Sequence, residues 1–428
     1  MELKLDTSKV YAIALEGGGA RGAWQVGAWR ALEEAGVRYN AVSGTSVGAI
    51  NGALMAMRDL TQAEQIWKDI RFSQIINVSD EDMGRIMGGG FENLAQVKSA
   101  FQTIKTIISD RGLDVEPLKN LLAERVDEDK IRNSGVELFL TTVSVTDRKE
   151  LEIDVKDLAE GEIKDMIMAS AYHPAFKQAP IGGKTYADGG FYDLVPISAL
   201  VSRGYKDLIV LRLNSFGIER RVKIPEDVTV TTIAPYKDLG NVLNFSSDQS
   251  AVNMVLGYYD AQRVLYGLYG HDYYIDRTMT EEEAYELLVR HLRPENTTLR
   301  QLNEDILPRF AKRLDCDGDY YDIFICMMER LAASCSLTPY RIRTDREFYE
   351  EVMALRTDDI PDKPDKILDL FLVEDYCGRW PLTMRARCSA FRYCPSPLGI
   401  VTAKQLDKLE FDGLLVSVAN LNVNTRCL

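Results

Sequence analysis

Residues 44–48 read Gly-Thr-Ser-Val-Gly and lie where an apolar, strand-like run changes into a helix-like run. A serine in this G-x-S-x-G pattern is typical of a nucleophile elbow, a tight strand-to-helix turn that exposes the hydroxyl group. Small residues flank such a serine because the helix must begin close to the sheet. The pattern therefore predicts an α/β fold in which Ser46 is a candidate nucleophile and Gly44 and Gly48 permit the turn.

A second glycine-rich turn comes earlier in the chain. Residues 11–16 predict a short buried strand, the run Gly17-Gly18-Gly19-Ala20-Arg21-Gly22 follows directly, and a helix is expected over 23–35. Backbone N–H groups at the start of a helix have no intrahelical partner and lie at the positive end of the helix dipole. We therefore expect this turn to suit a negatively charged oxygen.

The third element is Tyr186-Ala187-Asp188-Gly189-Gly190, which follows a hairpin turn predicted at Gly182-Gly183. An aspartate followed by two glycines lies on uncrowded backbone. Its carboxylate can therefore approach a serine hydroxyl closely, which makes Asp188 the second candidate catalytic residue.

These three segments, in this order, resemble the patatin-like phospholipase family, whose pattern is G-G-G-x-R-G, then G-x-S-x-G, then D-G-G or D-G-A. The Ala-Ser pair at 169–170 with Pro174 extends the resemblance, which is strong over residues 8–215 and weak as far as 275. One departure is Asp193, where we expect an asparagine in many members of the family.

The resemblance implies a serine acyl-ester hydrolase that acts on lipid esters through a Ser-Asp dyad and an acyl-enzyme intermediate. Ser46 would be the nucleophile and Asp188 the general base, with no metal or cofactor. The implied oxyanion hole consists of the backbone amides of Gly17, Gly18 and Gly19, with Arg21 adding positive potential. The implied supporting residues are Gly44, Gly48, Gly189 and Gly190.

The chain has three histidines, His173, His271 and His291, and none has the context of an α/β-hydrolase triad, in which a late histidine follows the acid on a loop. His173, beside a proline in an apolar segment, is expected to line a pocket or to be structural. We expect Ser170 to bond to backbone at a helix end.

Two other classes of function stay open. The spacing Gly17-x-Gly19-x-x-Gly22 also matches the dinucleotide fingerprint of an oxidoreductase, but residues 41–46 lack the acidic residue that would bind the ribose. The other alternative is a catalytically silent protein that binds a lipid or a partner on the same fold. Transfer of the acyl group to an alcohol instead of water would use the same dyad.

The chain of 428 residues has a net charge of −14 and a pI near 4.9, which argue against nucleic acid and against strong electrostatic docking on an anionic membrane. We therefore expect at most peripheral membrane contact, or a dispersed substrate such as a lysophospholipid. No signal peptide or transmembrane run is evident, and the seven cysteines all lie at or after residue 316 with irregular spacing. These features favour a cytoplasmic protein, with export by a route lacking a cleavable signal as an alternative.

The alternation of strand-like and helix-like runs predicts a three-layer α/β/α domain with a largely parallel central sheet over residues 8–275. Residues 276–428 predict a mainly helical accessory region. Helices are expected there over 281–292, 302–314, 322–333 and 345–355. A glycine triplet within 79–110 would permit a mobile cover or an interfacial surface, but an ordinary core-packed helix after a flexible loop is the preferred interpretation.

Overall fold

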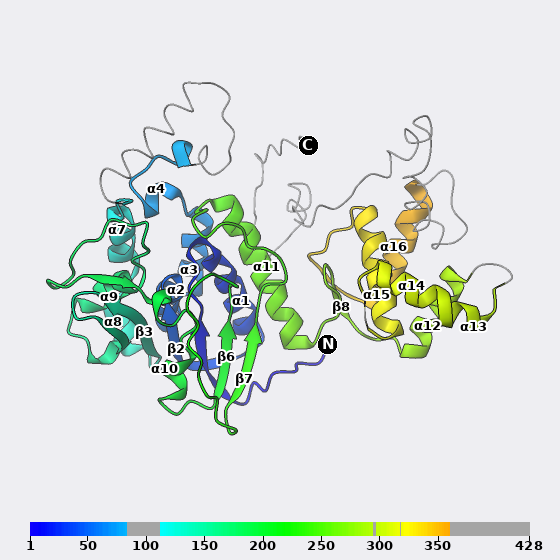
Figure 1. The fold of residues 1–428 in the computed structure, drawn as a ribbon, viewed down its shortest axis with the longest axis horizontal. Helices are drawn as coiled ribbons and strands as arrows, with labels where there is room; N and C mark the ends of the chain where they lie inside the picture. Colours follow the sequence, from blue (N-terminus) through cyan, green and yellow to red (C-terminus); the bar gives the residue numbers. More distant parts are fainter. Residues whose placement is uncertain (84–111, 294–296, 317, 360–428) are drawn as a thin grey trace. The chain divides into compact units, whose positions relative to one another are not determined.

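The computed structural model of the chain, shown in Figure 1, describes residues 1–83, 112–293, 297–316 and 318–359. The described chain divides into two compact units, one over Leu3–Leu265 and one that begins at Tyr266. The domain limits expected from the sequence, 8–275 and 276–428, remain predictions. Most of the cover predicted over 79–110 lies outside the described residues, from residue 84 onward, as does the accessory region from residue 360 onward.

The first unit contains a mixed, mostly parallel seven-stranded sheet in the order β4-β3-β2-β1-β6-β7, with β5 also pairing with β3. Neighbouring pairs among β1, β2, β3, β6 and β7 are parallel, whereas β4 and β5 run antiparallel to β3. The strands are β1 Val10–Leu15, β2 Arg38–Thr45, β3 Glu137–Ser144, β4 Lys149–Asp154, β5 Tyr186–Asp188, β6 Asp207–Leu211 and β7 Thr229–Ile233.

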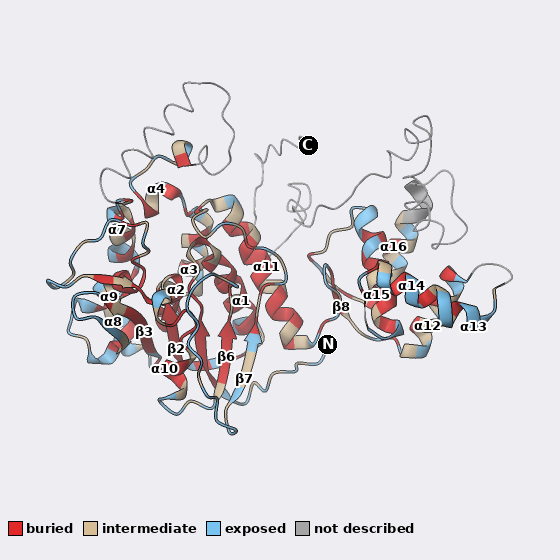
Figure 2. Ribbon diagram, in the orientation of Figure 1, coloured by how far each residue is buried: buried red, intermediate tan, exposed pale blue. Residues whose placement is uncertain are grey.

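Helices flank both faces of this sheet, which gives the three-layer α/β/α fold expected from the sequence (Figure 2). Side chains alternate along β1, so Ala12 and Ala14 face a core cluster that includes Leu200 of α10. On the opposite face, Leu15 lies close to Gly52 of α2. The α-helices of the unit are α1 Ala23–Glu34, α2 Val47–Ala56, α3 Leu60–Asp69, α4 Phe72–Ile75, α7 Glu116–Arg125, α8 Glu128–Asn133, α9 Glu162–Ser170, α10 Ile197–Val201 and α11 Ser247–Tyr266.

One edge of β3 brings two distant segments together. β4 occupies one edge of β3 over residues 139–144, so β2 and β5 share the other edge. Thr45 at the end of β2 pairs with Thr141, and Asp188 at the end of β5 pairs with the next residue, Thr142. The residue that follows Thr45 is therefore placed next to Asp188.

The second unit is mainly helical in its described part, as the sequence predicted. Its core includes the buried side chains of Leu288, Phe324 and Phe348. A small parallel sheet of β8 (Tyr274–Asp276) and β9 (Ile342–Thr344) accompanies the helices. The helices are α12 Glu281–Leu292, α13 Leu299–Gln301, a π-helical turn Leu302–Ile306, α14 Leu307–Arg313, α15 Tyr320–Ser334 and α16 Asp345–Asp359.

Candidate active site

Ser46 lies on the tight turn between β2 and α2, as the G-x-S-x-G pattern predicted. Its backbone has φ 55° and ψ −122°, a left-handed conformation that is strained for a residue with a side chain. A Cβ atom on Gly48 would lie 2.4 Å from the carbonyl oxygen of Leu15, so only glycine lets the helix begin this close to the sheet. The Ser46 amide donates to Ser170 Oγ at 2.9 Å, which helps to hold the turn.

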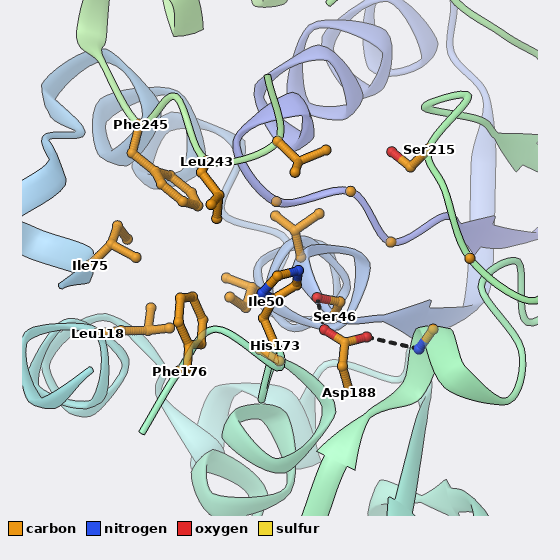
Figure 3. A pocket seen from close by; sticks show the side chains of 18 of the residues that line it. Ser46, Ile50, Ile75, Leu118, His173, Phe176, Asp188, Ser215, Leu243 and Phe245 are labelled. Atoms are coloured by element: carbon orange, nitrogen blue, oxygen red, sulfur yellow. Dashed lines mark hydrogen bonds between the residues drawn. The ribbon is translucent and has the colours of Figure 1, made fainter. Parts of the chain in front are cut away.

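Asp188 lies at the end of β5, and its carboxylate bonds directly to the serine. Ser46 Oγ donates to Asp188 Oδ2 at 2.6 Å, and the Gly190 amide donates to Asp188 Oδ1 at 2.8 Å (Figure 3). The Asp188 amide donates to the carbonyl oxygen of Tyr172 at 3.0 Å, which fixes the backbone as well. Both carboxylate oxygens are therefore oriented, and the sequence-predicted pair is in hydrogen-bond contact.

Burial raises the pKa of Asp188, whose residue is 6% exposed. The hydrogen bonds from Ser46 and Gly190 and the nearby His173 act in the opposite direction, because they stabilise the charged form. A carboxylate with a raised pKa accepts a proton more readily than one in water. The environment therefore makes Asp188 a stronger base than an exposed aspartate.

The glycine turn of residues 17–19 lies against the same cavity as Ser46 and Asp188. The Gly17 amide donates to the carbonyl oxygen of Leu194 at 3.0 Å, so its hydrogen is already bonded. The amides of Gly18 and Gly19 make no hydrogen bond to any other residue that the structure describes. Of the three glycines predicted from the sequence, two therefore offer amides to a ligand.

The structure places the Arg21 side chain among backbone carbonyls. Its Nε donates to Gly240 O at 2.8 Å and its Nη1 to Asn214 O at 2.9 Å. Nη2 lies 3.7 Å from Asp238 Oδ1, and the residue is not among those that line the cavity. Arg21 thus ties together two loops beside the glycine turn, a structural role that the sequence analysis did not predict.

Glu16 is a second residue whose role sequence reasoning missed. This fully buried carboxylate accepts hydrogen bonds from the Leu213 amide at 2.7 Å, the Ser215 amide at 2.8 Å and Arg212 Nε at 2.8 Å. It therefore fixes the loop after β6 against the glycine turn. The available signal was a charged residue at the end of an otherwise apolar strand.

A cavity of about 500 Å³ opens beside the Ser46–Asp188 pair and is lined mostly by apolar side chains. In Figure 3, several of these side chains gather at the left of the view, away from Ser215, and Ser46 and Asp188 lie nearer the centre. The labelled apolar residues on that side are Ile75, Leu118, Phe176, Leu243 and Phe245. The volume is typical of sites for small molecules, and the apolar lining suits a hydrocarbon chain.

His173 also lines this cavity, as the sequence predicted. Its Nδ1 accepts a hydrogen bond from the Ala175 amide at 3.2 Å, so the neutral ring carries its proton on Nε2. Ser170 Oγ donates to the carbonyl oxygen of Thr141 at 2.6 Å, which confirms that this hydroxyl bonds to backbone. Neither side chain takes the place of Asp188 beside Ser46.

Within the ranges that the structure describes, no group of three or more His, Cys, Asp or Glu side chains is placed to hold a metal ion. No helix of the described chain is both long and apolar enough to cross a bilayer.

The family model described as "Patatin-like phospholipase" matches residues 13–201, as the three motifs predicted. The patatin-like phospholipase domain-containing protein 7 of Rattus norvegicus is 27% identical over 209 residues, covering 49% of this chain and 14% of that protein. Lysophospholipase NTE1 of Cryptococcus neoformans var. neoformans is 26% identical over 204 residues, covering 47% of this chain and 11% of that protein. The match thus spans a small part of these relatives' length.

Among solved structures, the crystal structure of VipD from Legionella pneumophila aligns with 83% of this chain and 81% of its own, at 14% identity and a TM-score of 0.35.

Proposed function

We propose that this chain is a serine acyl-ester hydrolase that acts on lipid esters through Ser46 and Asp188. The observation that carries the proposal is the 2.6 Å hydrogen bond from Ser46 Oγ to Asp188 Oδ2 at the edge of an apolar cavity. A serine hydroxyl becomes nucleophilic when a base in hydrogen-bond contact accepts its proton. The pair has this geometry without a histidine.

In the first half of the reaction, Ser46 Oγ attacks the ester carbonyl carbon while Asp188 Oδ2 accepts the hydroxyl proton. The carbonyl oxygen becomes an oxyanion, which the unpaired amides of Gly18 and Gly19 stabilise. The intermediate then collapses, the bond to the leaving alcohol breaks, and Asp188 returns its proton to the alcohol oxygen. The products of this half are the free alcohol and an ester between the acyl group and Ser46.

In the second half, water attacks the Ser46 ester and Asp188 accepts the proton of that water. Collapse of the second oxyanion releases the carboxylic acid and returns the proton to Ser46 Oγ. An alcohol in place of water would give acyl transfer with the same residues.

The substrate class that we propose is a lipid with a single acyl chain, such as a lysophospholipid. The cavity offers one mainly apolar chamber beside the dyad, and its volume of about 500 Å³ suits one chain better than two. The printed name of the Cryptococcus relative, a lysophospholipase, is consistent with this class. The cytoplasmic location and the accessory role of the region after residue 275 stay predictions.

Fluorophosphonate labelling of the wild-type chain, Ser46→Ala and Asp188→Asn tests the proposal. It should be measured beside hydrolysis of a short-chain aryl ester, lysophosphatidylcholine and phosphatidylcholine. Asp165→Asn is a matched control, because it replaces an exposed aspartate of α9. We expect labelling and ester turnover in the wild type and the control, and loss of both in Ser46→Ala.

A folded wild-type chain that neither labels nor turns over any ester would contradict the hydrolase. That result would favour the silent lipid- or partner-binding protein on the same fold. Faster turnover of phosphatidylcholine than of lysophosphatidylcholine would contradict the single-chain substrate while leaving the dyad intact.

A further inference from the structure

Three exposed apolar side chains surround the mouth of the cavity. Phe216 is fully exposed, Ile218 is 54% exposed and Phe191 is 51% exposed, and all three also line the cavity. We call these three residues the apolar rim. An exposed aromatic group that continues into an apolar site is an unusual surface for a chain in water.

The loop that carries Phe216 and Ile218 is held in place by backbone hydrogen bonds. The Ile218 amide donates to Gly190 O at 2.9 Å, and the Leu194 amide donates to Ile218 O at 2.7 Å. At the start of the loop, the buried Glu16 carboxylate accepts the amides of Leu213 and Ser215. The exposure of Phe216 is therefore a fixed feature of the surface beside Asp188.

The loop that carries Phe216 and Ile218 continues into two basic residues, Arg221 and Lys223, although the whole chain carries −14. Glu219 accepts two hydrogen bonds from Arg212, at 2.9 and 3.0 Å, and Arg220 bonds to Glu152 at 3.0 Å. Arg221 and Lys223 are exposed, and neither has an ion-pair partner among the residues that the structure describes. These two cations of the loop complement anionic head groups.

We propose that the apolar rim, with Arg221 and Lys223 later in the same loop, is the surface by which this chain docks on a lipid bilayer. The proposal rests on the proposed function, because the rim opens directly into the cavity of the Ser46–Asp188 pair. Phe191, Phe216 and Ile218 enter the interfacial region of the bilayer, as aromatic and aliphatic anchors do in peripheral proteins. An acyl chain then passes from the bilayer into the cavity without crossing water.

Co-sedimentation with vesicles tests the docking surface. The protein is the full chain carrying Ser46→Ala, so that no lipid is consumed, and the vesicles are phosphatidylcholine alone or mixed with phosphatidylglycerol. In this background, F216S and the triple change F191S/F216S/I218S remove the rim, and R221S/K223S removes the charge. V145S is the matched control, because Val145 is 51% exposed and does not line the cavity.

We expect F216S to weaken partitioning onto both kinds of vesicle by about tenfold, because transfer of one large apolar side chain is worth about one decade in the partition constant. The triple change should abolish measurable binding, R221S/K223S should weaken binding only to the mixed vesicles, and V145S should bind like the parent. Circular dichroism melts of each variant establish that it is folded. Unchanged partitioning of the folded triple variant, or no vesicle binding by the parent chain, overturns the proposal.

Hydrolysis of a soluble aryl ester by the wild-type chain tests the hydrolase activity independently of the docking surface. Turnover of the soluble ester without vesicle binding would leave the hydrolase standing and overturn the docking surface. In that outcome the rim would be a site for a protein partner. Rim-dependent vesicle binding without turnover of any ester would support the docking surface and remove the hydrolase.

Discussion

Ser46 and Asp188 are in contact because their neighbours hold each of them in an unfavourable setting. Ser46 is strained and Asp188 is buried. Ser46 has a positive φ, and Asp188 is buried with both oxygens bonded. Such a setting costs free energy and persists only where the surrounding contacts determine it. The sequence predicted both residues, because each lies in a short motif whose glycines indicate the backbone conformation around it.

Asp188→Asn tests the base at the residue scale. An asparagine has nearly the same shape but cannot accept the proton of Ser46, so we expect kcat/KM for an aryl ester to fall by on the order of 10³. The wild-type rate should also rise with pH through a pKa above the ordinary 3.8, because burial raises that of Asp188. Near-wild-type activity of the folded variant would exclude the dyad.

His173→Ala should leave most of the activity. His173 accepts the Ala175 amide and faces the cavity, but the proton acceptor of Ser46 is already Asp188. We expect kcat/KM to fall by less than about tenfold. A fall as large as that of Asp188→Asn, with His173→Asn equally inactive, would instead show a histidine-assisted mechanism.

Asp193 is the position where the chain departs from the asparagine expected in the family. Burial raises the pKa of Asp193 to about 6, from the ordinary 3.8. The folded chain therefore holds a proton there that the unfolded chain has lost, and stability decreases as the pH rises from 3.8 to about 6.

We expect Asp193→Asn to remove this decrease, because the amide does not ionise. The difference in the free energy of unfolding between the variant and the wild type should change by about 2 kcal/mol in favour of the variant from about pH 4 to pH 7, at roughly 1.4 kcal/mol for each pKa unit. Urea unfolding at the two pH values measures the difference. A difference in unfolding free energy that stays constant with pH would show that the Asp193 carboxyl group does not cause the loss of stability.

At the scale of the element, the loop after β6 depends on one buried side chain from another strand end. Glu16 accepts two amides of this loop and also Arg212 Nε. Glu16→Gln replaces one acceptor oxygen by an amino group, so at least one buried donor loses its partner. We expect a loss of about 1–3 kcal/mol in the free energy of unfolding, measured by urea titration.

Glu34→Gln in α1 provides the matched control for that change, because its carboxylate is partly exposed and bonds to Arg30 and Tyr258 at the surface. We expect a change of less than about 1 kcal/mol there. Equal effects of the two variants would contradict the anchoring role of Glu16.

The elements that the sequence predicted are those with strong local periodicity. The strand 10–15 and the helix 281–292 match the expected runs closely, because burial on one or both faces leaves a pattern in each. β5 has only three residues and pairs with β3 far along the chain, so no periodic signal could place it. The bonds of Gly17, Arg21 and Glu16 also join distant segments, which is why their roles were not foreseen.

At the scale of the whole molecule, each unit has its own buried core. Leu32 of α1 lies in the first unit and Leu288 of α12 in the second, and both are at most 1% exposed. We expect Leu288→Ala to destabilise its own unit by about 2–5 kcal/mol, because it leaves a cavity.

Calorimetry of Leu288→Ala and the matched Leu32→Ala distinguishes the two cores. We expect two heat-absorption transitions in the wild type, with Leu288→Ala lowering one and Leu32→Ala the other. Fluorophosphonate labelling of Ser46 should disappear with the transition that Leu32→Ala lowers. A single transition shifted equally by both changes would show one cooperative unit.

Thr45 pairs with Thr141, and Asp188 pairs with Thr142. Two consecutive residues of β3 therefore fix the separation between Ser46 and Asp188. The separation of Ser46 and Asp188 is set by the backbone pairing of the sheet, so the two residues are in place once the sheet has formed. For the proposed hydrolase, the pair needs no assembly step, so we expect any control of the reaction to act on the entry of the lipid into the cavity.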